Sequence, residues 1–404
     1  MQVDFNLDAF IRRCVTKRER SLLDDDLARH DAELRECVDG ARVLVIGGAG
    51  SIGSGYIKAL LRFKAAKLVV VDTGENELTE LTRDLRSAGT YPVPEDFLTY
   101  PVSFADHVFK KLYKAHGPFD IVANFAAHKH VRSEKDVFSI EALIENNVFR
   151  ARDLLDLLCE TPPRHFFCVS TDKAANPVNI MGASKKLMEE LILAYADRLP
   201  VKTARFANVA FSNGSLPFGF LQRLHKRQPW ACPLGIRRFF VSPGESGELC
   251  LLASIIGKSG DIIFPKLDPG RDMISFEQVA SDLLRELGME PDPCKTENEA
   301  WEKMKSRVAG KWPVYYFESD TSGEKSFEEF YTPEETLAFG MFYNLGVIKN
   351  AKRRSLAEID AIFEKLRRLF AANDVSKKKI VTVLRDCLPN FSHIEKGRGL
   401  DSKM

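Results

Sequence analysis

A glycine-rich stretch constrains the fold of this chain more strongly than any other feature. The β-branched run RVLVI (42–46) leads directly into GGAGSIG (47–53), and an amphipathic segment follows. In such a strand–turn–helix arrangement, Gly47 permits the tight turn and Gly50 lets backbone N–H groups approach a pyrophosphate. Gly53 lets the helix pack closely on the strand. The spacing predicts a dinucleotide-binding βαβ unit; the alternative is a glycine turn that only reverses the chain.

The residues after the turn indicate which dinucleotide is bound. A helix beginning near Ser51 and Ile52 would direct the positive end of its dipole toward the phosphates. Asp72 comes directly after the run KLVVV (67–71). A carboxylate in this position accepts a hydrogen bond from the adenosine ribose 2′-hydroxyl and repels a 2′-phosphate. Because Thr73, not an arginine, comes next, the sequence favours NAD over NADP.

Short apolar runs alternate with amphipathic segments through the first half of the chain. This alternation is typical of βαβ units that build a parallel sheet covered on both faces. We therefore expect an α/β fold, namely a Rossmann-type doubly wound parallel sheet with a smaller interleaved C-terminal substrate lobe. The expected strands are RVLVI (42–46), KLVVV (67–71), FDIVANF (119–125), HFFCVS (165–170) and VKTARF (201–206).

The pattern divides the chain into four parts. Residues 1–40 are polar and helical in character, and we interpret them as an N-terminal arm. Residues 41–210 form the expected NAD-binding domain, to which segments near 235–265 return. Residues 211–330 are expected to form the sugar-nucleotide-binding lobe, and Pro, Gly and aromatic residues become more frequent through 211–245. Residues 331–404 are expected to be a helical extension, with apolar positions at helical spacing.

Composition excludes several classes of partner. The 404 residues carry 58 Lys and Arg against 57 Asp and Glu, a net charge of +1, which argues against nucleic-acid binding. The eight cysteines include no C-x-x-C pair, so no zinc or redox site is indicated. The N-terminal segment lacks the apolar core of a signal peptide, and no stretch reaches the length of a membrane span. We expect a cytoplasmic protein.

A second stretch, HFFCVSTDKAANPVNIMGASKKLMEE (165–190), places polar residues after a predicted strand and a lysine on the following helix. Its STDKAANPVNIMGASK portion resembles the extended short-chain dehydrogenases/reductases, in the nucleotide-sugar 4,6-dehydratase branch of bacterial polysaccharide and glycan synthesis. Further stretches resemble that branch in the same order: NFAAHKHV (124–131), ENNV (145–148), RFANVAFSNGS (205–215), RRFFVSP (237–243) and SGEKSFEEF (322–330).

The resemblance implies a reaction and a catalytic set. The reaction would be the NAD-dependent dehydration of a UDP-N-acetylhexosamine, such as UDP-N-acetylglucosamine, to a 4-keto-6-deoxy sugar nucleotide. By resemblance, Asp172 protonates the departing 6-hydroxyl and Lys173 is the base at C5. Thr171 would hydrogen-bond the 4-hydroxyl, Lys185 would contact the nicotinamide ribose, and Asn147 would support the catalytic lysine. For Lys173 to act as a base, its pKa must fall.

Met181 occupies the position where most short-chain dehydrogenases have a tyrosine four residues before the lysine. A thioether exchanges no proton, so Met181 is not the acid or base. The resemblance is to a branch that itself has Met here and retains the C5 configuration. Which group replaces the tyrosine as a base stays open, and so does the identity of the sugar.

Other residues fall on motif positions without a role in proton transfer. Ala126 and Ala127 are expected beside the cofactor. The expected substrate ligands are Lys129, Arg205, Asn208, Ser212, Arg237, Arg238 and Lys325, with Arg238 the foremost candidate for the diphosphate because arginine presents planar donors. A structural ion pair between Glu324 and Lys325 is the alternative for that pair. His128 and His130 have no third ligand nearby in the sequence, so no metal is expected.

Two alternative functions are also compatible with the sequence, and the resemblance implies an oligomer. A nucleotide-sugar 4-epimerase would share the fold but would not need the Asp-Lys pair, and a non-catalytic NAD- or sugar-nucleotide-binding regulator would be consistent with Met181. The resemblance implies a homodimer or higher homo-oligomer, formed through helices near 140–160 and 183–198. Ser103 is the nearest polar substitute for an Asp that in the family touches adenine.

Overall fold

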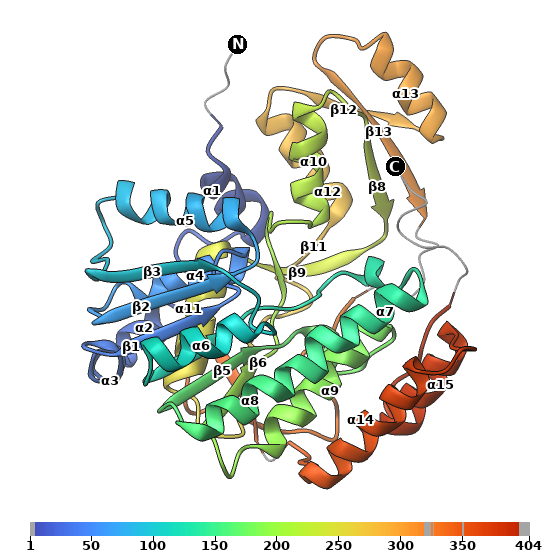
Figure 1. Cartoon of the computed structure of the whole chain (residues 1–404). Helices are drawn as coiled ribbons and strands as arrows, with labels where there is room; N and C mark the ends of the chain where they lie inside the picture. The colour runs from blue at the N-terminus through green and yellow to red at the C-terminus, as the bar shows by residue number, and fades with distance from the viewer. Residues whose placement is uncertain (1–4, 319–324, 326, 350, 396–404) are drawn as a thin grey trace.

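A computed structural model describes residues 5–318, 325, 327–349 and 351–395, and its centre is a large sheet (Figure 1). Within the described residues this sheet has nine strands. Neighbours from β10 to β3 pair in parallel, and β15 and β14 extend one edge in antiparallel orientation. In spatial order the strands are β14 (Thr336–Ala338), β15 (Leu345–Lys349), β10 (Ile262–Pro265), β6 (Val201–Ala204), β5 (His165–Val169), β4 (Ile121–Asn124), β1 (Arg42–Ile46), β2 (Lys67–Asp72) and β3 (Asp96–Pro101). The expected α/β doubly wound sheet is confirmed.

Each central strand is apolar on both faces because helices cover both sides of the sheet. In β1, Val43 and Val45 face one hydrophobic core, and Leu44 and Ile46 face another. This is the pattern expected of strands buried on both faces. The first core is covered by α4 (Ser51–Leu60), α5 (Glu75–Ser87) and α11 (Pro243–Ile255). The second is covered by α6 (His107–His116), α7 (Val137–Ile144), η3 (Glu145–Phe149), α8 (Arg150–Glu160) and α9 (Ile180–Ala194).

The five predicted strand runs all form strands of this sheet, with ends that differ by at most two residues. The order of the sheet reverses between β1 and β4. From β1 the strands follow one another to β3 at one edge, and from β4 they run through β5 and β6 toward the other edge. In open α/β sheets, ligands bind outside the carboxyl ends of the strands at such a reversal. The functional residues should therefore lie where β1, β4 and β5 end.

A smaller lobe lies beyond the ends of these strands and contains two further sheets (Figure 1). Its core includes Trp230, which is fully buried and stacks on Phe220 with ring centroids 4.7 Å apart. The sequence alone did not indicate β12, because Pro291 and Pro293 have no backbone N–H to donate to a neighbouring strand. As an edge strand, β12 tolerates both prolines. The strands are β7 (Asn208–Val209), β9 (Arg237–Val241), β11 (Met273–Ser275), β8 (Trp230–Leu234), β13 (Lys311–Glu318) and β12 (Glu290–Cys294), and the helices are α10 (Leu216–His225), α12 (Phe276–Glu286) and α13 (Glu297–Lys305).

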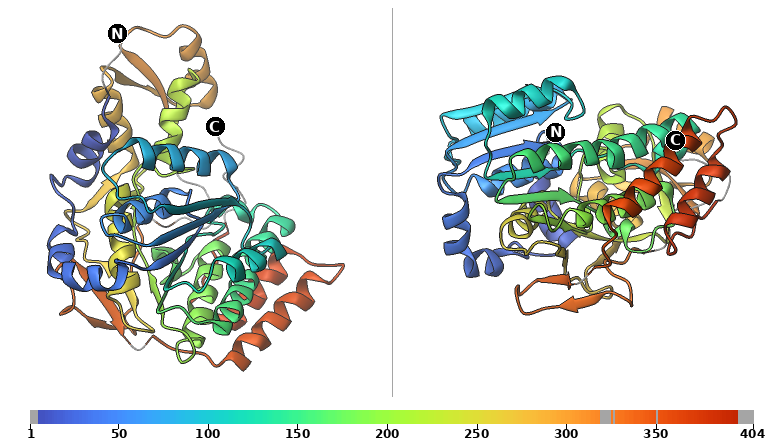
Figure 2. Two further views of the ribbon diagram at one scale, coloured as in Figure 1. Left: turned by 60° about the vertical axis from the view of Figure 1, so that its left-hand side comes forward. Right: turned by 60° about the horizontal axis from the view of Figure 1, so that its bottom comes forward.

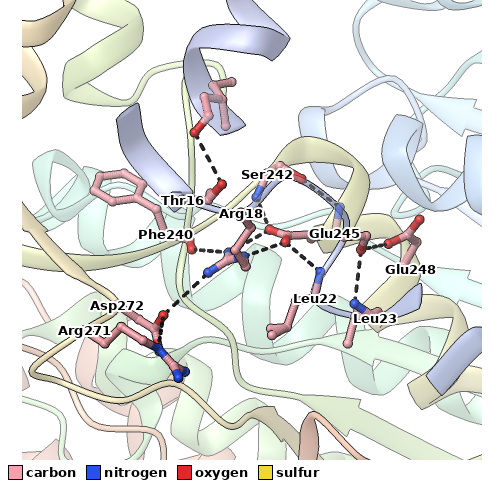
Figure 3. A network of polar contacts seen from close by, with 12 residues as sticks. Thr16, Arg18, Leu22, Leu23, Phe240, Ser242, Glu245, Glu248, Arg271 and Asp272 are labelled. Atoms are coloured by element: carbon pink, nitrogen blue, oxygen red, sulfur yellow. Dashed lines mark hydrogen bonds and ion pairs between the residues drawn. The ribbon is translucent and has the colours of Figure 1, made fainter. Parts of the chain in front are cut away.

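The N-terminal arm is tied to the connection between β9 and α11 (Figure 3). Arg18 donates to both carboxylate oxygens of Glu245 at 2.8 Å and to the Phe240 carbonyl at 3.0 Å. Burial would raise the pKa of Glu245, but Arg18 outweighs burial and lowers it below the usual range. The arm thus holds the strand that carries Arg238. Its elements are α1 (Leu7–Phe10), η1 (Ile11–Thr16), α2 (Asp24–Arg29) and α3 (Asp31–Val38).

The segment after residue 330 is not only helical, because β14 and β15 join the main sheet before α14 (Leu356–Phe370) and α15 (Lys377–Cys387) begin. The two helices lie beside α8 and α9 (Figure 2). Phe363 packs edge-on against Phe149 at 5.0 Å, and Arg152 pairs with Asp360 at 2.7 Å. The surface where the resemblance implies contact between copies is thus partly covered by the chain itself. Among the described helices, none is long and apolar enough to cross a membrane.

Candidate functional site

A cavity of about 390 Å³ lies at the reversal of the sheet, beyond the ends of β1, β2 and β4. It brings together the predicted cofactor residues except Lys185. These lining residues are Gly47, Gly50, Ser51, Ile52, Gly53, Asp72, Ala126 and Ala127. Ser103, the nearest polar substitute after β3, also lines the cavity.

The glycines of the turn occupy positions that admit no side chain. Gly47 has a φ of +73°, and a Cβ there would lie 2.5 Å from the backbone nitrogen of Ala126. A Cβ on Gly53 would lie 2.3 Å from the Gly47 carbonyl oxygen. Gly50 stands at the N-cap of α4, whose first N–H groups point toward the cavity end of the sheet. This backbone cradle fits a pyrophosphate at a helix N-terminus.

Asp72 is held in place by the backbone of two loops. One of its carboxylate oxygens accepts from the Ala49 N–H at 3.0 Å, and the other accepts from the Gly74 N–H at 3.0 Å. The carboxylate therefore joins the glycine turn to the end of β2 and lines the cavity. A carboxylate fixed there suits a ribose with free hydroxyls.

A second cavity of about 220 Å³ continues from the first and shares Ile52, Phe125, Ala127 and Lys129 with it. It lies beyond the end of β5. Several predicted catalytic and substrate residues line it, namely Lys129, Thr171, Lys173, Met181, Lys185, Asn208 and Ser212. The second cavity thus adjoins the glycine-lined one, with the four shared residues in both walls.

Asp172 and Lys173 form a charged cluster at the start of η4 (Asp172–Ala174). Asp172 is buried, and one of its oxygens accepts from the Thr171 hydroxyl at 2.8 Å, the Lys173 N–H at 2.9 Å and the Lys173 ammonium at 3.1 Å. A further carboxylate, Glu328, lies 3.8 Å from the same ammonium. The Asp-Lys pair is therefore a buried cluster rather than a surface ion pair.

The charge of Lys173 differs from the expectation for a base. Burial alone would lower the pKa of this ammonium, but the carboxylates of Asp172 and Glu328 outweigh burial and raise it above its usual value. Without a ligand, Lys173 is thus a protonated ammonium held between two acids. It must lose a proton before it can accept one from a substrate.

Helix α9 presents the other residues of the second cavity. The Asn179 side chain caps the helix by accepting from the Gly182 N–H at 2.7 Å, which fixes where α9 begins. Met181 forms an apolar wall in the first turn. One turn later, the Lys185 ammonium donates to the Val169 carbonyl at 2.7 Å, and burial lowers its pKa. Lys185 therefore loses its proton more readily than Lys173, and burial lowers the pKa of Lys129 in the same cavity as well.

Asn147 does not line either cavity, and it acts as a bridge. Its carbonyl oxygen accepts from the His128 N–H at 2.8 Å, and its amide donates to the His128 carbonyl at 2.9 Å. The same amide donates to the Ser184 hydroxyl at 3.1 Å, next to Lys185. Asn147 thus supports the lysine helix indirectly and fixes the loop after β4.

Arg205 lies outside both cavities, which corrects the expectation that it binds substrate. It is fully buried and donates to both oxygens of Glu189 at 2.8 Å and both oxygens of Glu335 at 2.9 Å. It also donates to the Phe330 carbonyl at 3.0 Å. These contacts occupy the guanidinium donors within the protein, so we assign Arg205 a structural role and leave it out of the substrate site.

The other predicted substrate ligands, Arg237, Arg238 and Lys325, line neither cavity. Arg237 is exposed and contacts backbone carbonyls, whereas Arg238 is buried and donates to the Arg237 carbonyl at 2.9 Å. Lys325 lies 3.9 Å from Glu329, and Glu324, its expected alternative partner, lies outside the described residues. Over the part of the chain that the structure describes, no three His, Cys, Asp or Glu side chains gather as a metal site.

Sequence reasoning missed a C-terminal strap, residues 391–394, that borders the site. The Ser392 N–H donates to the Pro177 carbonyl and the Ile394 N–H to the Val178 carbonyl, both at 3.0 Å. His393 lies 3.6 Å from Glu134, whose carboxylate accepts from the Met181 N–H at 3.0 Å. No sequence motif pointed to these backbone contacts, because any residue except proline supplies them.

We expect Ser392→Pro to loosen the loop before α9. The substitution removes the N–H that bonds to Pro177, and such a bond contributes about 1 kcal/mol, or roughly fivefold in a local opening equilibrium. Hydrogen exchange of the amides at 179–183 should be about fivefold faster than in the unaltered protein. Ser392→Ala keeps the N–H and serves as the control; equal exchange in both variants would contradict a role for the strap.

Comparison with known proteins places this site in a family. Residues 43–340 match the family described as "Polysaccharide biosynthesis protein". The "Uncharacterized membrane protein MJ1061" of Methanocaldococcus jannaschii is 32% identical over 300 residues, which are 72% of this chain and 81% of that protein. The "UDP-N-acetylglucosamine 4,6-dehydratase (inverting)" of Campylobacter jejuni is 27% identical over 238 residues, or 57% of this chain and 68% of that protein.

Other relatives widen the range of names. The "Probable polysaccharide biosynthesis protein EpsC" of Bacillus subtilis is 27% identical over 64% of this chain, and the match spans 42% of that protein. The "UDP-glucose 4-epimerase" of Rickettsia massiliae is 28% identical over 55% of this chain and 65% of that protein. The names of these relatives thus include both dehydratases and epimerases.

Solved structures share the fold at lower identity. Pen from Bacillus thuringiensis is 20% identical with a TM-score of 0.59, covering 77% of this chain and 87% of that chain. DesIV (dTDP-glucose 4,6-dehydratase) from Streptomyces venezuelae, with NAD and TYD bound, is 19% identical with a TM-score of 0.55, covering 72% and 88%. Since the family match spans most of the chain and a relative at 32% identity covers 72% of it, this chain belongs to the polysaccharide biosynthesis protein family.

Proposed function

We propose that this protein is an NAD-dependent nucleotide-sugar 4,6-dehydratase that acts on a UDP-N-acetylhexosamine, with UDP-N-acetylglucosamine as the first substrate to test. The observation that carries the proposal is the buried Thr171–Asp172–Lys173 cluster beside a cavity that continues into the glycine-lined one. Elimination of water needs an acid and a base side by side, whereas epimerisation at C4 does not. The dehydratase relatives named above support the same reading.

The glycine turn, Ala126 and Ala127 would hold NAD, with Asp72 at the adenosine ribose. When bound, the nicotinamide supplies reversible hydride acceptance, from C4 of the sugar and back to C6. The cradle formed by Gly47 and Gly53 leaves room for backbone N–H groups to meet the diphosphate without side chains in between. Asp72 repels a 2′-phosphate, so NAD is the proposed cofactor rather than NADP.

Proton handling is assigned to residues around the second cavity. Thr171 would orient the 4-hydroxyl, and Lys185, whose pKa is lowered by burial, would accept its proton in place of the missing tyrosine. Asp172 would protonate the departing 6-hydroxyl, and Lys173 would accept the proton from C5. Before this step the proton shared by the pair must pass from the Lys173 nitrogen to an Asp172 oxygen, which lie 3.1 Å apart. Asn208 and Ser212, which line the second cavity, are proposed to contact the sugar. Arg238, outside that cavity, is proposed to bind the diphosphate.

A single incubation tests this function. The purified protein is mixed with UDP-N-acetylglucosamine in deuterated water, and the nucleotide sugar is followed by mass spectrometry. We expect a product that has lost one water and carries one deuterium from solvent at C5. An isomer of unchanged mass would identify a 4-epimerase instead, and binding without turnover of any UDP-N-acetylhexosamine would favour a regulator.

Cofactor choice is tested at Asp72. We expect Asp72→Asn to bind NAD about tenfold or more weakly, because a hydrogen bond from the ribose to a charged acceptor contributes about 1.5–3 kcal/mol. Binding of NADP should improve relative to NAD, since the repulsion of the 2′-phosphate is removed. Titration calorimetry with both dinucleotides measures the change, and thermal unfolding of the ligand-free variant checks that the loop contacts of Asp72 were not the cause. Tighter binding of NADP than NAD by the unaltered protein would contradict the assignment.

A further inference from the structure

We propose that Glu328 is a positioning residue for the proposed dehydration, and that its charge decides whether Lys173 carries the proton that it shares with Asp172. The inference rests on the proposed function for its meaning, but its physical content is an interaction within the protein. Glu328 is a titratable side chain beside the cluster that the sequence motifs did not assign to any task. It lies in the connection between β13 and β14.

The segment that carries Glu328 is packed so that the Glu328 side chain points inward. Glu328 and Phe330 are buried, whereas Phe327 before them and Glu329 between them are exposed. This alternation is that of an extended segment with one face inward. Phe330 packs on Phe239 with ring centroids 5.3 Å apart. The segment is therefore anchored from within, and the anchored face carries Glu328 toward Lys173.

The charges around Glu328 come from several elements. Asp172 and Lys173 approach it from η4, Arg238 from β9, and Lys325 from its own segment. Lys173 forms an ion pair with Glu328, with 3.8 Å between its nitrogen and the carboxylate oxygen. With both carboxylates ionised, the ammonium of Lys173 is stabilised from two sides. With Glu328 protonated, one of these sides is neutral.

The charge of Glu328 affects where the proton of the Asp172–Lys173 pair resides. The proposed reaction needs Lys173 as a free amine and Asp172 as a carboxylic acid, which requires one N–H bond to break and one O–H bond to form. An ionised Glu328 opposes that transfer because it favours the ammonium, and a protonated Glu328 permits it. Burial raises the pKa of Glu328, although Lys173 acts in the opposite direction. Burial prevails, so Glu328 is protonated more readily than an exposed glutamate, and its protonated form biases the pair toward the reactive state.

The first test measures Lys173 directly and needs no turnover. The protein is labelled with ¹³Cε-lysine, the Lys173 signal is assigned by its loss in Lys173→Arg, and its chemical shift is followed against pH. We expect Glu328→Gln to lower the titration midpoint of Lys173 by about one pH unit or more, a tenfold change in proton affinity, since a negative charge near the ammonium is removed. Glu329→Gln is the matched control, because the adjacent carboxylate is exposed. Equal midpoints in Glu328→Gln and the unaltered protein would overturn the proposal.

The second test measures water loss against pH. We expect Glu328→Gln to change the shape of the kcat profile by removing its dependence on the Glu328 proton, with a smaller change in KM, and Glu328→Asp to restore part of the profile. A purely structural role would lower kcat equally at all pH values and lower the temperature of unfolding, and this outcome would overturn the proposal. If the unaltered protein releases no water from any UDP-N-acetylhexosamine, the proposed function fails, and the lysine titration still decides whether Glu328 controls Lys173.

Discussion

Asp172→Asn and Lys173→Met should each stop the loss of water while NAD remains bound. A positioned acid or base contributes about 10²–10⁴-fold to a rate, so we expect kcat to fall by about that factor in each variant. Asn keeps the shape of Asp172 but donates no proton from a carboxyl group. Met removes the amine of Lys173 and keeps most of its length. Neither side chain lines the glycine cavity, so cofactor content should be unchanged.

The measurement pairs turnover with two checks on integrity. Loss of water from UDP-N-acetylglucosamine is followed by mass spectrometry, and NAD released on denaturation is measured by absorbance. Thermal unfolding is needed for Lys173→Met in particular, because that variant leaves Asp172 and Glu328 as neighbouring buried acids without their cation. Asp153→Asn, on the exposed side of α8, is the control. Near-normal turnover in both site variants would refute the roles given to the pair.

Arg205→Met should cause the largest loss of stability among substitutions that leave the cavities untouched. Removing this cation leaves the fully buried carboxylate of Glu189 and the partly buried carboxylate of Glu335 without their guanidinium partner. Breaking a buried pair in this way costs about 3–5 kcal/mol, because a desolvated charge remains. Urea unfolding of the protein should show that decrease. Arg368→Met, which breaks an exposed pair on α14, should leave the midpoint almost unchanged.

A second substitution distinguishes the buried charge from lost packing. Arg205→Met combined with Glu189→Gln removes the uncompensated carboxylate and should recover part of the lost stability. A decrease below about 1 kcal/mol in Arg205→Met, or no recovery in the double variant, would contradict the structural role of this ion pair.

The same pair predicts how stability depends on pH. Burial alone would raise the pKa of Glu189, but Arg205 outweighs burial and lowers it from 4.5 to about 2. A depressed pKa means that the stabilisation is complete above the unfolded value and is lost as pH falls from about 4.5 toward about 2. In Arg205→Met the sign reverses, because the buried acid then prefers its protonated form. The difference in free energy of unfolding between the two proteins should therefore shrink as the pH is lowered to about 3.

Sequence motifs predicted most of the candidate site because they lie on local structure. The turn around Gly47 and the strand end at Asp72 are set by residues close together in the chain, and the same is true of Thr171 to Lys185. Each depends on backbone geometry that a few neighbouring residues determine. This is why the dinucleotide cavity contains the residues that the glycine spacing predicted.

Arg205 shows where the same reasoning failed. A motif position beside a strand end favoured a substrate ligand, but the partners of Arg205 include Glu335, which is 130 residues away in sequence. Only the tertiary structure brings Glu335, just before β14, to Arg205, just after β6. The direction in which a long charged side chain points follows from such distant partners, and no local pattern specifies them.

By itself, the sequence determined the class of sheet and the glycine turn, and it predicted which residues would transfer protons. The tertiary structure decided which of those residues are charged. Lys173 was expected to have a lowered pKa, and burial does act in that direction, yet Asp172 beside it and Glu328 from a remote segment raise it. Lys185 is buried and donates to a backbone carbonyl, and its pKa stays lowered. The two lysines belong to one motif, but the charges that surround them come from different parts of the fold, and proton affinity follows the surroundings.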